Sequence, residues 1–305
     1  MLRYYNKIIA AVLAIAMAFG LAAPAYATGI TDGFVIENGV LTAYTGDDTV
    51  VRVPDSVTAI ANGAFRNNTT MTELYLGKNV VSIDYNIAYG AAALTTVHLP
   101  DGDTPVAVAG SAFYGCENLT TLVLGPSVVS VAESFLNIST LQQIVADPEN
   151  TWYYSRDGVL FRRESSATDL TLVRMPRNSP ITDYTVPSDC YVTAIGENAF
   201  YECNNLTSVV ISAGVKEIRD EAFSYCRNLK TIDMGPDVQE LEAYAFYYCS
   251  ALESLTLSPA LDDVLTSTNG TLSNSPLKTL IVPKNAAYIP SNMMFKDTLT
   301  EIIVE

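Results

Sequence analysis

Basic residues, histidine and tryptophan are scarce in this chain of 305 residues. It has 17 lysines and arginines against 33 aspartates and glutamates, with one histidine and one tryptophan, and its net charge is −16. An acidic chain without basic runs is a poor match for nucleic acid or for an anionic membrane surface. The single histidine, His98, has no acid or cysteine at metal-ligand spacing. We therefore expect His98 to be a solvated surface residue, and we expect no metal or cofactor.

The standard catalytic sequence motifs are also missing. No G-x-S-x-G, H-E-x-x-H, C-x-x-C, glycine-rich phosphate loop or dinucleotide fingerprint occurs. Ser275 to Lys278 spells S-x-x-K, but the companion motifs S-D-N and K-T-G are absent, and Leu277 belongs to an apolar pattern. Adjacent carboxylates such as Asp262 and Asp263 do not face one another, so they make no acid/base pair. We predict that the protein is not an enzyme.

The amino terminus holds a short apolar run. Arg3 and Lys7 flank its start, the run extends from Ile8 to Leu21, and Ala25-Tyr26-Ala27 has the A-x-A form of a cleavage site. The run is shorter than the about 20 residues of a membrane span, although a membrane anchor is the alternative. We predict a signal peptide at 1–27 and a secreted or cell-surface protein. Cleavage would leave 15 basic and 33 acidic residues, a net charge of −18.

A motif that returns about every 23 residues accounts for most of the chain. If its first apolar residue is position 0, Ala-Phe or a close substitute stands at +4 and +5, leucine at +11, and apolar residues at +14 and +16. The clearest repeats start at Ile195, Ile218 and Leu241. Others start at Ile60, Ile83 and Val108, near Val131 and Ile289 in a form one residue shorter, and near Val264 in an irregular form.

This spacing indicates a leucine-rich-repeat solenoid, whose periods run from about 20 to 29 residues. The second half of each repeat alternates apolar and polar residues, as a strand does. We predict an α/β, right-handed solenoid of parallel strands, with a short second strand such as Val215 to Ile218 and a short helical turn at the Ala-Phe segment. One repeat cannot bury its apolar face alone, so stacking must build a continuous core.

The signature I-G-x-x-A-F-x-x-C-x-x-L-x-x-V/I-x-I resembles the BspA-like leucine-rich repeats. Residues 195–211 fit it at every fixed position, and the resemblance covers nearly all the chain after residue 30. It implies adhesion to host matrix proteins and cell–cell attachment. No residue-level binding motif transfers with the resemblance, because a fold does not by itself define a function.

Two segments outside the repeats have a hairpin pattern. Residues 28–56 contain an Asn38-Gly39 turn, and we predict that they cap the open end of the core before the repeats of 57–146. Residues 147–190 contain a pattern similar to that of the cap, with Asp157-Gly158 in the place of Asn38-Gly39. We predict an inserted hairpin island here, as the BspA-like resemblance also implies, with a true domain boundary as the alternative. Repeats continue over 191–305.

Cysteine and asparagine each recur at one repeat position. The cysteines at +8 are Cys116, Cys203, Cys226 and Cys249, and the asparagines at +10 are Asn118, Asn205 and Asn228. We favour buried thiols over a metal site or a disulfide, although one neighbouring pair could reach disulfide distance. Cys190 lies outside the pattern. The asparagines are expected to bond to the backbone as a structural ladder.

Strand alternation sends positions +13 and +15 of each repeat to the solvent, where they form one sheet face. The candidate binding residues on it are Tyr75, His98, Val123, Val145, Val210, Asp233 and Thr256. Trp152 and Tyr153 of the island are a second candidate, because exposed aromatic side chains anchor proteins and sugars well. The alternative is that β-branched residues stand on this face because they suit strands.

We therefore expect a recognition protein that binds host or neighbouring-cell proteins or glycans through the solenoid face, in other words an adhesin. The alternative is a non-catalytic structural spacer or envelope component. We expect no nucleic-acid partner and no membrane span after signal cleavage. The last strand pattern, 301–305, has no polar cap, which predicts self-association through the carboxy-terminal end.

Overall fold

The computed structural model describes residues 29–108, 110–132, 138–164, 169–261, 270–286 and 298–305. Regular structure in these residues consists of strands. Among them no helix is long and apolar enough to cross a membrane. The predicted signal peptide at 1–27 lies outside the described residues, as does much of the repeats predicted near Val264 and Ile289. Two compact units are distinguished, 1–140 with 146–152 and 141–145 with 153–305.

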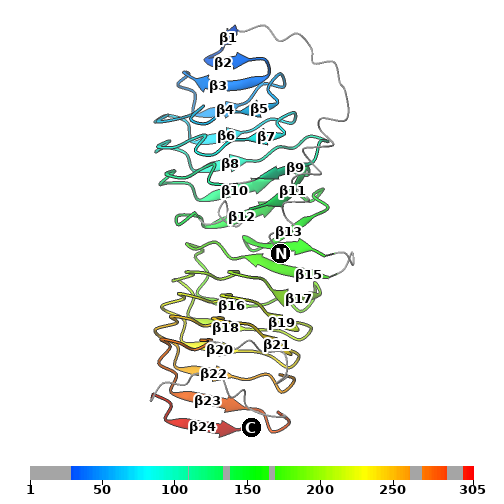
Figure 1. Cartoon of the computed structure of the whole chain (residues 1–305), viewed down its shortest axis with the longest axis vertical. Coiled ribbons are helices and arrows are strands. Elements are labelled where there is room, and N and C mark those ends of the chain that lie inside the picture. The colour runs from blue at the N-terminus through cyan, green and yellow to red at the C-terminus, as the bar shows by residue number, and fades with distance from the viewer. Residues whose placement is uncertain (1–28, 109, 133–137, 165–168, 262–269, 287–297) are drawn as a thin grey trace. The chain divides into compact units, whose positions relative to one another are not determined.

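The first unit contains two rows of stacked strands (Figure 1). One row begins with the antiparallel strands β1 (Gly29–Thr31), β2 (Phe34–Glu37) and β3 (Val40–Tyr44) and continues in parallel through β5 (Ala59–Ile60) and β7 (Ser82–Ile83). The other row is parallel and holds β4 (Val50–Arg52), β6 (Glu73–Tyr75), β8 (Thr96–His98) and β10 (Thr121–Leu124). A further parallel pair is β9 (Val106–Val108) with β11 (Val128–Val131).

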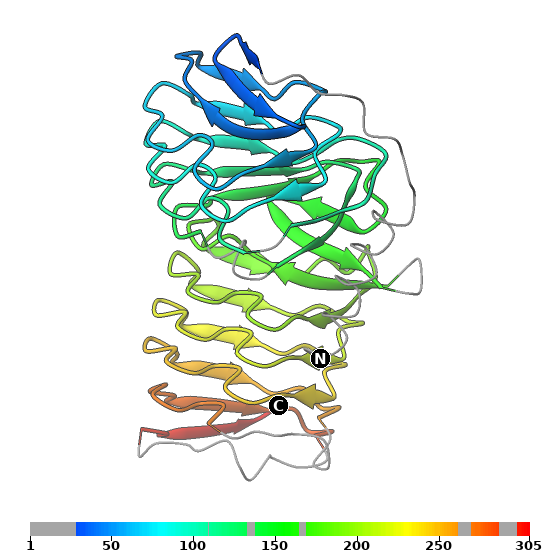
Figure 2. The same ribbon diagram turned by 45° about the horizontal axis from the view of Figure 1, so that its top comes forward.

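The second unit repeats this plan (Figure 2). After β12 (Gln143–Ala146), its first row opens with antiparallel β13 (Tyr153–Arg156), β14 (Val159–Arg163) and β15 (Leu170–Arg174) and continues in parallel through β17 (Val192–Ile195), β19 (Glu217–Ile218) and β21 (Glu240–Leu241). Its second row is β16 (Asp183–Thr185), β18 (Ser208–Val210), β20 (Thr231–Asp233), β22 (Ser254–Thr256), β23 (Thr279–Val282) and β24 (Glu301–Val304), all parallel.

Both predicted hairpins are present. Asn38 and Gly39 have φ of 52° and 81°, and Asp157 and Gly158 have φ of 54° and 77°. Two left-handed residues in a row make the two-residue turn whose twist suits a hairpin, and Asn-Gly and Asp-Gly adopt it readily. Strand β15, which follows the second hairpin, pairs in parallel with β17, so the island hairpin is the first part of the second unit's sheet.

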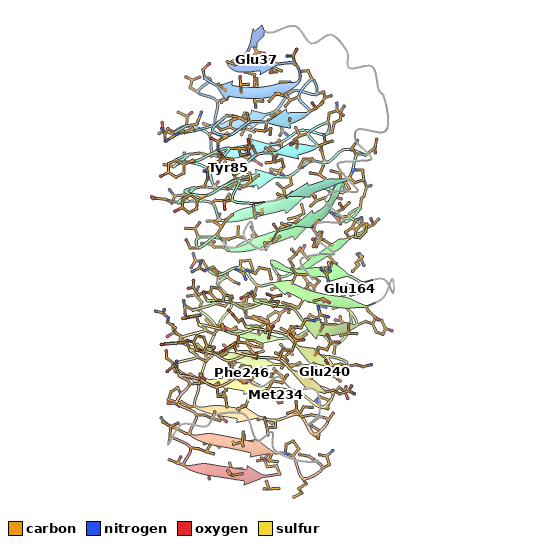
Figure 3. The ribbon with its side chains drawn as sticks, viewed as in Figure 1. Glu37, Tyr85, Glu164, Met234, Glu240 and Phe246 are labelled. Carbon is orange, nitrogen blue, oxygen red and sulfur yellow. The ribbon has the colours of Figure 1, made fainter. Side chains whose placement is uncertain are left out.

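Stacking of the repeats builds a continuous apolar core in the second unit, as predicted. Phe200, Phe223 and Phe246 are fully buried and lie ring against ring, with centroids 4.6 Å apart for the first pair and 5.5 Å for the second. Figure 3 shows Phe246 and the buried Met234 among the packed side chains of this unit. The recurring phenylalanine of the motif is therefore the centre of each layer.

The prediction of helical turns at the Ala-Phe segment is wrong. Positions +3 and +7 have left-handed backbones, for example Asn198 and Glu202, whose φ angles are 55° and 56°. A left-handed residue interrupts a right-handed helix. The amide groups instead bond along the stack: Phe200 N–H donates to Ala222 O at 2.7 Å, and Glu202 N–H donates to Ser224 O at 3.0 Å. Each such segment is a series of tight turns joined to the next repeat.

The recurring cysteines are buried, as predicted, and each thiol donates to a backbone carbonyl. Cys226 Sγ lies 2.9 Å from Phe200 O, and Cys249 Sγ lies 3.1 Å from Phe223 O. In the next repeat Ser275 takes the cysteine's place, and its Oγ donates to Phe246 O at 2.7 Å. The residue at +8 is thus a small buried donor that ties one repeat to the preceding one.

The predicted asparagine ladder is also confirmed. Asn228 Nδ2 donates to Asn204 O at 2.6 Å, and Asn205 Nδ2 donates to Ser179 O at 2.9 Å. Asn118 Nδ2 donates to Ala92 O at 2.7 Å in the same way. Each amide satisfies a carbonyl of the preceding repeat that the turn leaves without a strand partner.

Thiol labelling provides a test of this packing. Burial raises the pKa of Cys116 and of Cys203 to about 12. Partial burial and the nearby Asp189 also raise the pKa of Cys190, but Cys190 is only half-buried and is therefore the accessible thiol. Because the thiolate is the reactive form, native protein at neutral pH should take up one maleimide quickly, at Cys190, and five after unfolding in guanidinium. A Cys190→Ser variant should take up none quickly. Rapid labelling of Cys203, Cys226 or Cys249 in the native protein would contradict the buried ladder.

Candidate recognition surface

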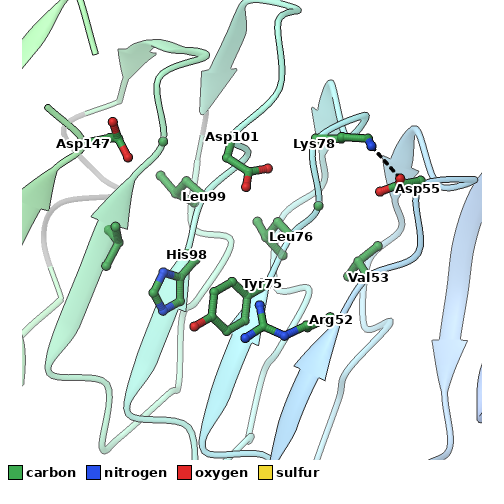
Figure 4. A pocket seen from close by; sticks show the side chains of 13 residues that line it. Arg52, Val53, Asp55, Tyr75, Leu76, Lys78, His98, Leu99, Asp101 and Asp147 are labelled. Carbon is green, nitrogen blue, oxygen red and sulfur yellow. Dashed lines mark ion pairs between the residues drawn. The ribbon is translucent and has the colours of Figure 1, made fainter. Parts of the chain in front are cut away.

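The residue at +15 of each repeat in the first unit lies on the same face of the second strand row. Arg52, Tyr75, His98 and Val123 are register partners on β4, β6, β8 and β10. Each follows a buried residue, and strand alternation turns it outwards. Figure 4 shows the first three side by side in a row.

Three of these side chains form a stack. The Arg52 guanidinium carbon lies 3.6 Å from the centre of the Tyr75 ring, and the Tyr75 and His98 rings are stacked with centroids 3.9 Å apart and an interplanar angle of 6°. Stacking of a guanidinium on an aromatic face is favourable electrostatically. The row is therefore already ordered before any ligand arrives.

Glu73 holds the stack in place. Its Oε1 accepts a hydrogen bond from the Tyr75 hydroxyl at 2.8 Å and lies 2.7 Å from His98 Nε2. The hydrogen bond from Tyr75 does most to lower the pKa of Glu73, and burial opposes it, while His98 and Arg52 lower the pKa further. Glu73 is thus a carboxylate that positions two neighbouring rings.

Beside the stack is a trough of about 280 Å³. Buried Val53, Leu76 and Leu99 are among its lining residues, together with Asp101 and Asp147 on the following loops (Figure 4). Lys78 and Asp55, also in the lining, form an ion pair at 2.7 Å. The trough therefore offers an apolar floor with the cation of Arg52 towards one end and two carboxylates towards the other.

His98 is not the solvated residue that we expected. It is half-buried between its stacking partner Tyr75 and its hydrogen-bond partner Glu73. The partner acid was missed because it lies 25 residues earlier in the chain and is brought close only by stacking of the repeats. An acid at +13 of the preceding repeat is the signal that could have identified it.

The predicted face residues fall into two groups. Tyr75, His98 and Val123 come together in the first unit, whereas Val210, Asp233 and Thr256 are register partners in the second. Every one of these side chains is at least partly exposed, as is Val145 on β12. Arg52 was missed because its strand lies in the segment that we assigned to the cap.

The two island aromatics differ in exposure. Trp152 is 50% exposed, as expected, but Tyr153 is only 4% exposed, so the expectation that it anchors a partner is wrong. Strand β13 begins at Tyr153, and the pleat turns this ring beneath the sheet. The neighbouring Tyr154 ring packs on Phe161 with centroids 5.8 Å apart.

The lining of the trough limits the chemistry that it can support. Among the described residues no group of three or more histidine, cysteine or carboxylate side chains is arranged to hold a metal. The groups that line it, a guanidinium, aromatic edges and carboxylates, suit hydrogen bonding and charge pairing with a ligand.

Comparison with known proteins agrees with the repeat pattern. The model of the BspA type Leucine rich repeat region matches in 6 copies, over residues 43–155 and 177–302. The chain belongs to the BspA-type leucine-rich repeat family. A search of curated proteins finds no match.

Several solved structures share the fold of this BspA-type protein. A leucine rich cell surface protein from Faecalibacterium prausnitzii is 19% identical with a TM-score of 0.50, over 93% of this chain and 96% of that one. The pneumococcal vaccine antigen PcpA is 18% identical with a TM-score of 0.62, over 90% and 76%. A leucine-rich repeat protein from Eubacterium ventriosum is 20% identical with a TM-score of 0.53, over 90% and 81%.

Proposed function

We propose that this protein is a secreted or cell-surface recognition protein of the adhesion type, which binds an extracellular protein or glycan without catalysis. The observation that carries the proposal is the trough beside the Arg52–Tyr75–His98 stack. Extended sheet faces are the surfaces that solenoid proteins commonly use for partners. The second unit has a strand face of its own, on which Val210, Asp233 and Thr256 are register partners.

The ordering of the stack supports this role. A partner that meets side chains already held by Glu73 and by one another loses little conformational entropy on binding. Arg52 is exposed and can pair with a carboxylate or sulfate, while Asp101 and Asp147 can accept hydrogen bonds from hydroxyl or ammonium groups. Such a set of groups suits a polar macromolecular surface.

The location of the protein is supported by two independent observations. Residues 1–27 have the pattern of a signal peptide. One of the structures that share the fold is described as a leucine rich cell surface protein. Fractionation of cells into culture medium, envelope and cytoplasm would test the proposal, and recovery of the protein in the cytoplasm would contradict it.

Binding assays can test whether the trough is the recognition site. Labelled wild-type protein is first applied to arrays of matrix proteins and glycans to find its partners. The affinity for each retained partner is then measured for the Tyr75→Ser and Arg52→Ser variants. Each substitution removes part of an ordered contact row, so the affinity should fall about tenfold. Tyr85→Ser is the matched control, because Tyr85 is a 59% exposed tyrosine of the same unit that does not line the trough.

Circular dichroism must show that the variants are folded. If every partner of the wild-type protein is retained equally by Tyr75→Ser and Arg52→Ser, the trough is not the recognition site. If no array component is retained by the wild-type protein, the spacer role is favoured instead.

A further inference from the structure

A second surface, away from the strand face, is formed by tyrosines on the tight turns of the second unit. We call it the tyrosine edge, and its members are Tyr201, Tyr225, Tyr244, Tyr247 and Tyr248. Neighbouring rings are in contact, with centroids 4.6 to 5.6 Å apart. Tyr244 and Tyr248 remain 42% and 39% exposed, so the cluster is open to solvent.

The backbone shows that the fold does not require tyrosine here. Tyr225, Tyr244 and Tyr248 have φ of 62°, 55° and 54°. The left-handed conformation costs a residue with a Cβ roughly 1–2 kcal/mol, and glycine and asparagine adopt it most readily. The same repeat positions elsewhere mostly hold such residues, namely Asn67, Asn86, Asn198, Gly90 and Gly115, although Glu202 and Glu221 also stand there with positive φ.

Glu202, Glu221 and Tyr191 share this left-handed backbone, so it is the contact between the rings of Tyr225, Tyr244, Tyr247 and Tyr248 at the surface that indicates a role outside folding. Asparagine at the three left-handed tyrosines of the edge would relieve the backbone and leave the core untouched, because the rings lie on the surface. Clustered tyrosines offer a large rigid contact area and cost little side-chain entropy. The edge therefore has the properties of a binding surface.

The charge around the edge indicates the kind of partner. The turn segments that carry these tyrosines, 196–204, 219–227 and 242–250, contain five acidic side chains (Glu197, Glu202, Asp220, Glu221 and Glu242) and two basic ones (Arg219 and Arg227). Asp220 is exposed and Glu221 partly exposed in the turn that leads to Tyr225. The edge also accepts a cation already, since the Arg227 guanidinium lies 5.9 Å from the centre of the Tyr225 ring.

The first unit has a related arrangement. Arg66 and Tyr89 occupy the same repeat position in successive repeats, and the Arg66 guanidinium lies 5.5 Å from the centre of the Tyr89 ring. Tyrosine rings of these turns thus take a guanidinium in two separate places.

We propose that the tyrosine edge docks a lysine- and arginine-rich polypeptide segment. Its cations lie over the exposed faces of Tyr244 and Tyr248 and pair with carboxylates such as Asp220 and Glu221. This site shares no residue with the trough, so a negative result for either proposal leaves the other unaffected.

A fluorescent decamer of arginine is the probe, titrated at physiological salt. The double variant Tyr244→Asn with Tyr248→Asn leaves the net charge unchanged, so any loss of affinity reports the rings. We expect binding about tenfold weaker than that of the wild-type protein. Thermal stability should be equal or higher, because asparagine tolerates the left-handed backbone.

Tyr191→Asn is the matched control. Tyr191 is also left-handed, with a φ of 53°, and is 68% exposed in the same unit, but it lies outside the edge. It should bind the decamer as the wild-type protein does.

Three results would overturn the proposal. The first is equal binding by the double variant. The second is an equal loss in Tyr191→Asn, which would show a general charge effect. The third is binding of a neutral oligosaccharide that depends on Tyr244 and Tyr248 while the arginine decamer is unaffected, which would assign the edge to glycans.

Discussion

Replacement of Phe223 with alanine is expected to lower the free energy of unfolding of the second unit by about 3–5 kcal/mol. Phe223 is fully buried between Phe200 and Phe246, so truncation removes contacts with the layers on both sides. The hole cannot close easily, because Phe223 N–H is bonded to Ala245 O at 2.8 Å and holds the spacing of the repeats.

Urea unfolding followed by far-ultraviolet circular dichroism, together with amide exchange over 195–250, would measure this loss. The matched control is Phe223→Leu, which keeps most of the apolar volume and should cost about 1 kcal/mol. A loss below about 1 kcal/mol for Phe223→Ala would show that the layers can collapse, and that the phenylalanine stack does not determine stability.

Replacement of Gly235 with alanine is expected to cost about 2–4 kcal/mol. Gly235 has a φ of 68°, and a Cβ there would lie 2.0 Å from the carbonyl oxygen of Ile211. The substitution thus combines an unfavourable backbone conformation with a clash against the backbone of the preceding repeat, which cannot rotate away.

Gly214→Ala is the matched control for the clash. Gly214 also has a positive φ, of 99°, but the nearest atom to its Cβ would be 3.6 Å away. Its cost should be about 1 kcal/mol, the conformational part alone. Equal losses of stability in the two variants, measured by the same urea titration, would show that close approach of successive repeats is unimportant at Gly235.

The trough shows which of its residues the alternation within single strands can predict and which it cannot. Tyr75, His98 and Val123 were placed on the outer face because alternation within a strand is a property of each short segment. Arg52 and the hydrogen bond between Glu73 and His98 were missed, because both depend on which strand lies beside which. The burial of Tyr153 was missed because the start of a strand decides which way its first side chain turns.

The sequence alone determined the repeat, its period, the apolar core and the two hairpin turns. These follow from side chains that recur at constant spacing and from Asn-Gly and Asp-Gly pairs that adopt one turn readily. Only the tertiary structure decided that the Ala-Phe segments are left-handed tight turns and not helical ones. Their amide groups bond to the next repeat, and that partner is a neighbour in space about 23 residues away.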